Sequence, residues 1–470
     1  MKKTKIICSI GPASTNPKVM AEMVKSGMNV ARINFSHATL EERKAVVKSV
    51  KEVRKTTGSH IGILYDTKGP EFRNDNLENG KVELIAGNTI RVVKEKVLGN
   101  QERFSVNHPS AIDSLEVGNI ILLENGLMKI EVISKEVDGV TCRIIVGGVL
   151  GNKKSLSVPG VQLDIPFISE QDREDLIYAC EHDGDFVALS FVNTKEDVAA
   201  AKVIFDSCNR SDMRIIAKIE SRTGVENVDS ILDVANGIMI ARGDLGVEVP
   251  VYELPIIQKR IIKKCRERGK ICIVATEMLE SMKKNIRPTR AEVSDISNAV
   301  LEGTDAVMLS GETTVGKYPV QTVKYMAEIC EFAEDNYNYD HKFKDLTNEN
   351  ITSTIAKGVV EATRDLDIKA IIAPTASGYT PKRMSNLKPN APIIAGCNSE
   401  KVAYSLALNW GVYPILIKPC TSIEEVLETT LSKELKESFG LSTGDNVVVT
   451  GSFPINLKTR TTNLMKIETL

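Results

Sequence analysis

Two segments, RIIAKIE at 214–220 and GIMIARGD at 237–244, carry the clearest evidence for the fold. Each half begins as an apolar strand, and the segment between them has a helical pattern. Lys218 and Glu220 stand two residues apart and therefore share one face of the first strand. Asp244 follows the second strand, where Gly243 lets backbone amides turn toward an anion. Together these groups indicate a metal-bound anionic substrate; the alternative is a buried ion pair that ends two core strands.

The same strand-then-helix pattern recurs along the chain. Eight strands are expected, at 5–10, 29–35, 60–66, 186–191, 214–220, 237–241, 271–275 and 306–310. Eight such units favour a closed (β/α)₈ TIM barrel, in which catalytic groups stand at the carboxyl ends of the strands. Polar residues do gather at those ends: Arg32, Asn34, Ser36, Asp66, Thr67, Lys68, Lys218, Glu220, Asp244, Thr276, Ser310 and Glu312. The barrel is expected to span 1–69 and 167–340.

Residues 70–166 interrupt this pattern. Short β runs at 89–93, 119–123, 128–133 and 140–146 are separated by glycines and polar turns, which indicates an inserted β domain. Because it follows a loop at the catalytic end, this domain could act as a lid that excludes water. Lys153 and Lys154 near its exit are either lid cations that reach phosphate or a solvated charged turn.

A third domain is expected at 345–470, after a helix at 319–336 and a charged linker near 337–350. Its expected strands, at 370–374, 392–397, 413–417 and 446–450, alternate with helices and predict an open α/β sheet. The loop after the first of them carries Thr375, Ser377, Gly378 and Thr380. These residues either bind an effector phosphate or form an ordinary helix cap.

Composition narrows the classes of partner. The 60 basic and 62 acidic residues give a net charge of -2, so no overall field favours nucleic acid or an anionic membrane. Nine scattered cysteines without a C-x-x-C pair indicate reduced thiols and a cytoplasmic protein. We expect neither a signal-peptide core nor a membrane span.

Residues 311–317, GETTVGK, match the Walker A pattern except at its last hydroxyl. Tyr318 stands where a short hydroxyl must touch Mg²⁺, and Pro319 fits the first position of a helix. We interpret the match as coincidental.

Six longer motifs resemble the pyruvate kinase family in order and over nearly the whole chain. They are TKIICSIGPAS at 4–14, MNVARINFSH at 28–37, DTKGPE at 66–71, IIAKIE at 215–220, ARGDLGVE at 241–248 and PTRAEVSD at 288–295. The resemblance implies a TIM barrel with an inserted β-barrel lid domain and a C-terminal open α/β regulatory domain. It further implies a homotetramer that makes pyruvate and ATP from phosphoenolpyruvate and ADP.

The resemblance also implies roles for the residues at the strand ends. Glu220 and Asp244 would bind Mg²⁺, or Mn²⁺ in its place, and Lys218 would support the transferring phosphoryl group. Arg32 and Arg73 would hold phosphoryl oxygens, and Gly243 would contact substrate. Thr276 would orient the proton source for the enolate. Such a site suits phosphoryl transfer, which needs positioning and charge neutralisation more than a covalent partner.

A second cation follows from the same resemblance. Asn34, Ser36, Asp66 and Thr67 offer only oxygens, a hard ligand set that in the family holds K⁺. Glu71 is typical of family members that require K⁺, whereas members with lysine there carry their own charge. Nucleotide contacts would come from Asn34, His37, Arg73 and Lys154; His37 can also be read as a turn residue.

The sequence departs from the family pattern at Glu277, where glutamine is common, at Asn193, where a basic residue is common, and at Ser155 and Ser157 in the lid exit. Two other functions are considered. One is a metal-dependent aldolase or lyase in which Lys218 forms a Schiff base or stabilises an enolate. The other is a sensor that binds a phosphorylated metabolite at the 375–380 loop and has no catalytic role.

Overall fold

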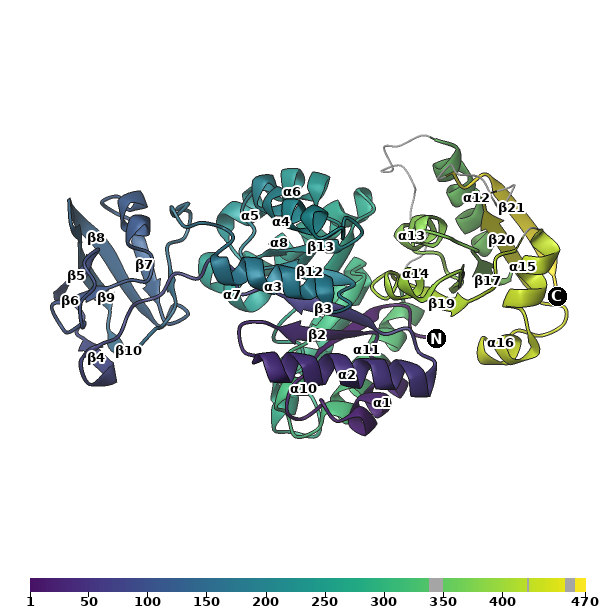
Figure 1. Cartoon of the computed structure of the whole chain (residues 1–470), viewed down its shortest axis with the longest axis horizontal. Helices are drawn as coiled ribbons and strands as arrows, with labels where there is room; N and C mark the ends of the chain where they lie inside the picture. Colours follow the sequence, from purple (N-terminus) through teal and green to yellow (C-terminus); the bar gives the residue numbers. More distant parts are fainter. Residues whose placement is uncertain (338–349, 421, 453–460) are drawn as a thin grey trace.

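The computed structural model describes residues 1–337, 350–420, 422–452 and 461–470. Three bodies lie along the long axis of the molecule, with a strand-rich lid at one end, a barrel in the middle and an α/β domain at the other end (Figure 1). The linker expected near 337–350 falls mostly outside the described residues.

The central body is a closed barrel of parallel strands in the order β1-β16-β15-β14-β13-β12-β3-β2. These strands are β1 (Lys5–Ser9), β2 (Val30–Asn34), β3 (Gly62–Asp66), β12 (Phe186–Leu189), β13 (Arg214–Ile219), β14 (Gly237–Ala241), β15 (Ile271–Ala275) and β16 (Ala306–Leu309). Ile7, Leu64 and Met239 fill the interior and the helices cover the outside. The barrel predicted from the sequence is confirmed.

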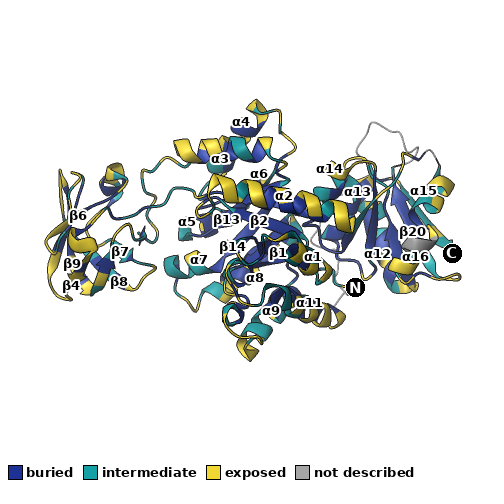
Figure 2. Cartoon of the chain, turned by 60° about the horizontal axis from the view of Figure 1, so that its bottom comes forward, coloured by how far each residue is buried: buried dark blue, intermediate teal, exposed yellow. Residues whose placement is uncertain are grey.

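Among the described residues of the barrel there are eleven helices: α1 (Pro17–Lys25), α2 (Leu40–Thr57), α3 (Glu170–Glu181), α4 (Lys195–Ser207), α5 (Arg222–Glu226), α6 (Val228–Val234), α7 (Arg242–Glu248), α8 (Leu254–Glu267), α9 (Arg290–Glu302), α10 (Gly311–Thr314) and α11 (Pro319–Asp335). A 3₁₀ turn, Glu280–Lys283, precedes α9. Helices α2, α3, α4 and α9 begin with capping boxes, which satisfy amides that the first turn leaves unpaired. Figure 2 shows the barrel strands buried and the outer surfaces of the surrounding helices exposed.

The lid is the separate strand-rich domain expected from the sequence, but its strands pair as two sheets and not as one closed β-barrel. Strands β4 (Lys81–Leu84) and β10 (Gly148–Gly151) form one. The other has the order β11-β7-β8-β9-β5-β6, from Leu156–Ser157, Ile120–Leu123, Met128–Glu136, Gly139–Val146, Thr89–Val93 and Arg103–Ser105. Turns of 3₁₀ helix lie at Glu78–Gly80 and Pro109–Ser114. The lid has its own apolar core, so it can keep its shape if it moves as a unit.

The C-terminal sheet has the order β19-β18-β17-β20-β21. Its strands are β17 (Ile368–Ile372), β18 (Ile393–Cys397), β19 (Val412–Leu416), β20 (Asn446–Gly451) and β21 (Leu464–Thr469), and its helices are α12 (Ile351–Asp365), α13 (Tyr379–Asn386), α14 (Glu400–Tyr404), α15 (Ile423–Thr430) and α16 (Lys433–Ser438). The sequence analysis missed β21, which pairs antiparallel at the sheet edge and is not followed by a helix. The expected open α/β sheet is otherwise confirmed.

The C-terminal domain packs on the amino end of the barrel, opposite the lid (Figure 1). Lys5 in β1 donates to the carbonyl of Val412 at 2.5 Å, and burial lowers its pKa to about 7. The guanidinium of Arg54 lies 3.5 Å from the ring centroid of Tyr404. The carboxyl end of the barrel therefore faces the lid. No helix in the described part of the chain is long and apolar enough to cross a bilayer.

Candidate active site

Four adjacent strands bring the first group of polar side chains together at the carboxyl end of the barrel. Strands β2, β3, β12 and β13 are neighbours, and the register pairs Asn34 with Asp66 and Leu189 with Ala217. Residues just beyond these pairs therefore reach the same rim. The structure brings Arg32, Asp66, Lys218 and Glu220 into one buried cluster, as the positions of their strands in the barrel require.

Lys218 is the centre of this cluster. Its Nζ lies 3.1 Å from Oδ1 of Asp66, 3.0 Å from Oε1 of Glu220 and 2.7 Å from Oγ of Ser190. Arg32 donates from Nε to Oδ2 of Asp66 at 2.7 Å. Two cations and two carboxylates thus alternate in a small buried volume, where charge pairs interact more strongly than in water.

The cluster shifts the protonation equilibria of its members. Burial opposes charge on Lys218, but Asp66 and Glu220 outweigh it and hold the lysine pKa above its ordinary value. Burial also opposes charge on Asp66, and Arg32 and Lys218 nevertheless lower its pKa. Glu220 behaves differently: burial, helped by the charge of Asp244, raises its pKa to about 7 despite Lys218. The ammonium is therefore fixed in its charged form, and Glu220 is more easily protonated than an ordinary glutamate.

The segment after β14 differs from the expected glycine-rich amide turn, because residues 242–248 form helix α7. Gly243 N instead donates to Oγ1 of Thr276 at 2.8 Å, and that hydroxyl donates to the carbonyl of Ala275 at 2.6 Å. Asp244 is exposed in the first turn of α7, where a negative charge is favourable. The backbone amides inferred to face an anion therefore belong to the first turn of a helix, and one of them, Gly243 N, is bonded to Thr276.

Thr276 has a strained backbone, with φ 70°, and its neighbour Glu277 has φ 54°. Arg242 supports this conformation by donating to the carbonyl of Thr276 at 2.7 Å, while its other nitrogen binds both oxygens of Asp295 at 2.7 and 2.6 Å. The sequence analysis did not single out Arg242 as a support. Its guanidinium and the Asp295 carboxylate lie in two of the quoted motifs, which was the available clue.

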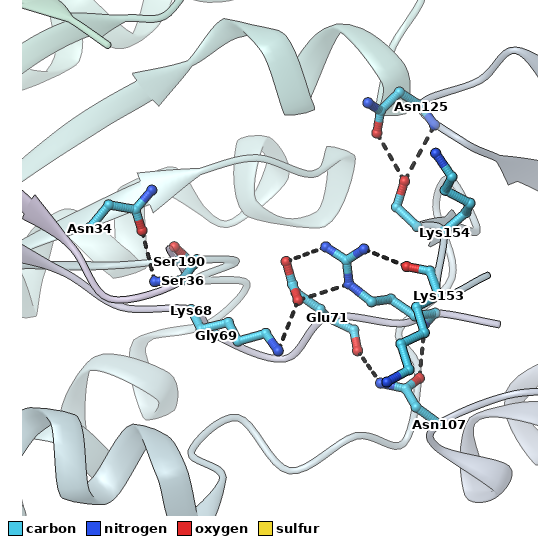
Figure 3. Close-up of polar contacts among 12 residues, drawn as sticks. Asn34, Ser36, Lys68, Gly69, Glu71, Asn107, Asn125, Lys153, Lys154 and Ser190 are labelled. Carbon is cyan, nitrogen blue, oxygen red and sulfur yellow. Dashed lines mark hydrogen bonds and ion pairs between the residues drawn. The ribbon is translucent and has the colours of Figure 1, made fainter. Parts of the chain in front are cut away.

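The four expected K⁺ ligands occupy neighbouring ends of β2 and β3, but they differ in accessibility. Asp66 and Thr67 are buried, whereas Ser36 is exposed. The side-chain oxygen of Asn34 accepts from Ser36 N at 2.9 Å (Figure 3). Thr67 Oγ1 accepts from Ser190 N at 3.1 Å. The structure therefore gathers this oxygen set at one edge of the barrel, beside the Lys218 cluster.

A second polar group lies where the chain enters the lid. Glu71 receives two bonds from Arg73, at 2.9 and 2.7 Å, and its Oε2 lies 3.3 Å from Nζ of Lys68. Arg73 also donates to the carbonyl of Lys153 at 2.7 Å. Burial opposes charge on Glu71, but these cations lower its pKa. Figure 3 shows Lys68, Glu71 and Lys153 around this junction, together with Asn107, which bonds the backbone there and was not anticipated.

A cleft of about 410 Å³ runs between lid and barrel, and none of the four residues of the Lys218 cluster lines it. Glu71, Arg73 and Lys154 line it from the lid side, and Asp244 lines it from the barrel. Nζ of Lys154 lies 2.5 Å from Oε1 of Glu124. Lys154 is therefore an ion-paired residue of the cleft wall, which matches neither the phosphate-binding lid cation nor the solvated charged turn in full. His37 is exposed on the turn after β2 and does not line this cleft.

The structure also places the residues at which the sequence departs from the family pattern. Asn193 lines the cleft, and its side-chain oxygen accepts from Ser221. Ser157 donates to Glu248 across the cleft, and Ser155 donates to Asn125 at 2.9 Å (Figure 3). Glu277 is exposed beside Thr276. Ser190, which binds Lys218, is a contact that the sequence analysis missed; its position at the end of β12 was the only clue.

Two further loops that the sequence analysis singled out lie outside the cluster at the rim. In the Walker-like segment, Glu312 is buried and accepts from the amides of Leu279 and Ser310 at 3.1 and 2.7 Å, so it bonds backbone. In the C-terminal domain, Thr375 Oγ1 accepts from Gly378 N at 2.9 Å, and Gly378 has φ 76°. Thr380 is buried and bonds Thr462, which leaves Ser377 as the exposed hydroxyl of that loop.

Two family models match this chain: "Pyruvate kinase, barrel domain" over residues 1–323 and "Pyruvate kinase, alpha/beta domain" over 353–468. Among curated proteins, the pyruvate kinase of Geobacillus stearothermophilus is 43% identical over 474 residues, covering 100% of this chain and 80% of that protein. The pyruvate kinase of Clostridium acetobutylicum is 40% identical, covering 100% and 99%. A crystal structure of a pyruvate kinase from Cryptosporidium parvum superposes with a TM-score of 0.95 at 36% identity, covering 100% of this chain and 96% of that one.

Proposed function

The chain belongs to the pyruvate kinase family, a family of phosphotransferases that convert phosphoenolpyruvate and ADP into pyruvate and ATP, and we propose that the buried cluster around Lys218 carries out this transfer. The observation that supports this assignment most strongly is that Lys218 is held charged between two carboxylates at the end of the barrel that faces the lid. An aldolase that uses Lys218 as a Schiff-base former would need a neutral amine, and this environment disfavours it.

Lys218 and Arg32 are proposed to hold the phosphoryl group. Both guanidinium and ammonium are oriented by Asp66, which bonds one on each of its oxygens. Their positive charges are fixed before substrate arrives, so the protein reorganises little when negative charge moves during transfer. Arg73 is proposed to reach the same group from the lid once Glu71 or Lys153 releases one of its nitrogens.

Glu220 and Asp244 are the proposed ligands of a divalent cation, Mg²⁺ or Mn²⁺. Among the described residues, no group of three or more His, Cys, Asp or Glu could hold a metal. Two carboxylates with substrate oxygens and water completing the shell suit Mg²⁺, which is usually bound in that way. Burial, helped by the charge of Asp244, raises the pKa of Glu220, and a bound cation would offset both effects by stabilising the ionised carboxylate. When bound, the ion would neutralise charge developing on the substrate oxygens.

The oxygen set Asn34, Ser36, Asp66 and Thr67 is proposed to hold K⁺. Support comes from the adjacency of β2 and β3 and from the hard character of these ligands. Arg73 and Lys68 both form ion pairs with Glu71, so neither of these side chains substitutes for the charge of K⁺. Dependence on K⁺ is therefore expected.

Thr276 is proposed to position the proton donor for the enolate. Its hydroxyl is already bonded to Gly243 N and the carbonyl of Ala275, which fixes its direction at the rim. Gly243 would contact the substrate by the close approach that a residue without a side chain allows. ADP is proposed to enter the cleft, where Arg73 and Lys154 would contact it from the lid. Asn34 and His37, which do not line the cleft, would contact the nucleotide from the barrel rim outside it.

A coupled assay tests the assignment. Pyruvate formation is measured with phosphoenolpyruvate and ADP, with Mg²⁺ present, and K⁺ is then exchanged for Na⁺. Activity that needs both the divalent ion and K⁺ is expected. Borohydride trapping in the presence of pyruvate provides the counter-test, because covalent labelling of Lys218 would favour the lyase reading instead.

We further propose domain limits at 1–69 with 167–340, 70–166 and 345–470, a homotetramer, and a cytoplasmic location. The C-terminal loop with Thr375, Ser377, Gly378 and Thr380 is proposed to bind a phosphorylated sugar effector. Ser377 is the residue that best supports this proposal, because it is exposed and precedes helix α13, whose amino end favours phosphate.

A further inference from the structure

Asp172 is a buried carboxylate that the proposed chemistry does not use. It is 3% exposed and occupies the third position of helix α3, which begins just after the chain returns from the lid. Its Oδ1 accepts from Gly69 N at 3.0 Å. Its Oδ2 accepts from Ser169 N at 3.2 Å and from Ser169 Oγ at 2.6 Å.

These contacts involve both connections between lid and barrel. Gly69 stands where the chain leaves the barrel, and Ser169 stands where it has returned. Figure 1 shows the two connections running from the lid to the same side of the barrel. We propose that Asp172 is a positioning residue. By hydrogen bonding to both connections, it restrains the base of the lid relative to the catalytic rim.

A role as a helix cap explains only part of this arrangement. The capping box of α3 accounts for the bonds between Asp172 and Ser169. The bond from Gly69 is additional, because it comes from the end of β3 and satisfies no amide of the helix. Hydrogen bonds to an ionised carboxylate are stronger than neutral ones, so this contact restrains the Gly69 segment.

Gly69 links Asp172 to both sides of the site. Its φ is 71°, and a Cβ added there would lie 2.9 Å from both Cβ and the carbonyl oxygen of Ser190, whose hydroxyl binds Lys218. Its own carbonyl accepts from Glu71 N at 2.9 Å, and Glu71 holds Arg73 in the cleft. Figure 3 shows Lys68, Gly69 and Glu71 along this segment. Movement of Gly69 would therefore shift the lid side of the cleft more than the buried cluster, which Asp66 and Arg32 also anchor.

The test compares Asp172→Ala with Ser169→Ala. Both weaken the cap of α3, but only the first removes the acceptor for Gly69 N, so Ser169→Ala is the matched control. Hydrogen exchange of the Gly69 amide, followed by NMR or mass spectrometry in the full-length enzyme, should accelerate about tenfold in Asp172→Ala and stay near wild type in Ser169→Ala. Asp172→Asn, which keeps one acceptor oxygen, should fall between them and serves if the alanine variant does not fold.

Steady-state kinetics supply the second readout and rest on the proposed nucleotide cleft. The KM for ADP should rise about tenfold in Asp172→Ala, with the KM for phosphoenolpyruvate changed by less than about threefold. Unchanged Gly69 exchange in both Asp172 variants, or equal effects in Ser169→Ala, would overturn the positioning role. Faster exchange with an unchanged KM for ADP would support that role and overturn the nucleotide cleft instead.

Discussion

Replacing Lys218 by methionine tests the proposed reaction most directly. The substitution keeps an unbranched side chain of similar length and removes the ammonium that contacts Asp66, Glu220 and Ser190. Asp66 retains Arg32 at 2.7 Å, and Glu220 retains the Phe191 amide at 2.7 Å. The rest of the cluster therefore keeps partners while the fixed charge is lost.

The expected loss can be estimated from the role of that charge. Removing one preorganised group that stabilises transition-state charge costs about 10²–10³-fold in kcat, or about 3–4 kcal/mol. Breaking a buried ion pair would by itself cost about 3–5 kcal/mol of stability. Glu220 lowers that cost, because its pKa of about 7 lets it take up a proton when the lysine is gone. We expect a folded enzyme whose phosphoryl transfer falls about 10³-fold.

The assay measures two half-reactions in the same preparation. Phosphoryl transfer is followed by pyruvate formation, and enolisation is followed by exchange of the pyruvate methyl protons into deuterated solvent. Enolisation should survive in part, because the residues proposed for it, Glu220, Asp244 and Thr276, are retained and no phosphoryl group is transferred. Lys5→Met is the matched control: it replaces another buried strand lysine, at the opposite end of the barrel, and should lower stability without the loss of transfer.

Two results would refute this reasoning. Phosphoryl transfer within about tenfold of wild type in Lys218→Met would show that the ammonium carries little of the transition-state stabilisation. Loss of Mg²⁺ affinity, measured by calorimetry and equal to the loss in a Glu220→Gln variant, would show that Lys218 serves the metal and not the phosphoryl group.

Four other outcomes follow from the structure. Glu71→Lys should reduce the dependence on K⁺ to less than about twofold, since it adds a cation beside the site; a wild-type requirement in a K⁺ titration would contradict this. Thr276→Ala should slow pyruvate proton exchange about 10²-fold, and an unchanged NMR exchange rate would exclude the role in protonation. Burial raises the pKa of Asp185 from 3.8 to about 6, so its protonation favours the folded state below pH 4 and this contribution disappears as pH rises through 6. The unfolding free energy of Asp185→Asn relative to wild type should therefore increase between pH 4 and 6, by up to about 3 kcal/mol, and a flat difference in urea titrations would count against it. Ser377→Glu should mimic or block a sugar-phosphate effector; unaltered cooperativity with each sugar phosphate tried would remove the proposed effector loop.

The sequence predicted the barrel because its evidence is local. Apolar runs of strand length, each ending in a polar residue, can be recognised one unit at a time, and eight of them close into a barrel whose rim collects the strand ends. Strand β21 was missed for the same reason, because an antiparallel edge strand lacks the helix that marked the others. Residues 242–246 were interpreted as a glycine-rich turn because glycine permits both a turn and the start of a helix, and neighbours such as Thr276 decide between them.

Local patterns in the sequence were enough to place residues at the strand ends, and the motifs identified the family. The interactions among those residues became visible only in the folded chain: Lys218 is held between Asp66 and Glu220, Arg242 supports Thr276, and Asp172 contacts both connections to the lid. The physical reason is range. Strand periodicity acts over a few residues, whereas burial and charge pairing depend on distances between atoms that lie tens to more than a hundred residues apart in the chain.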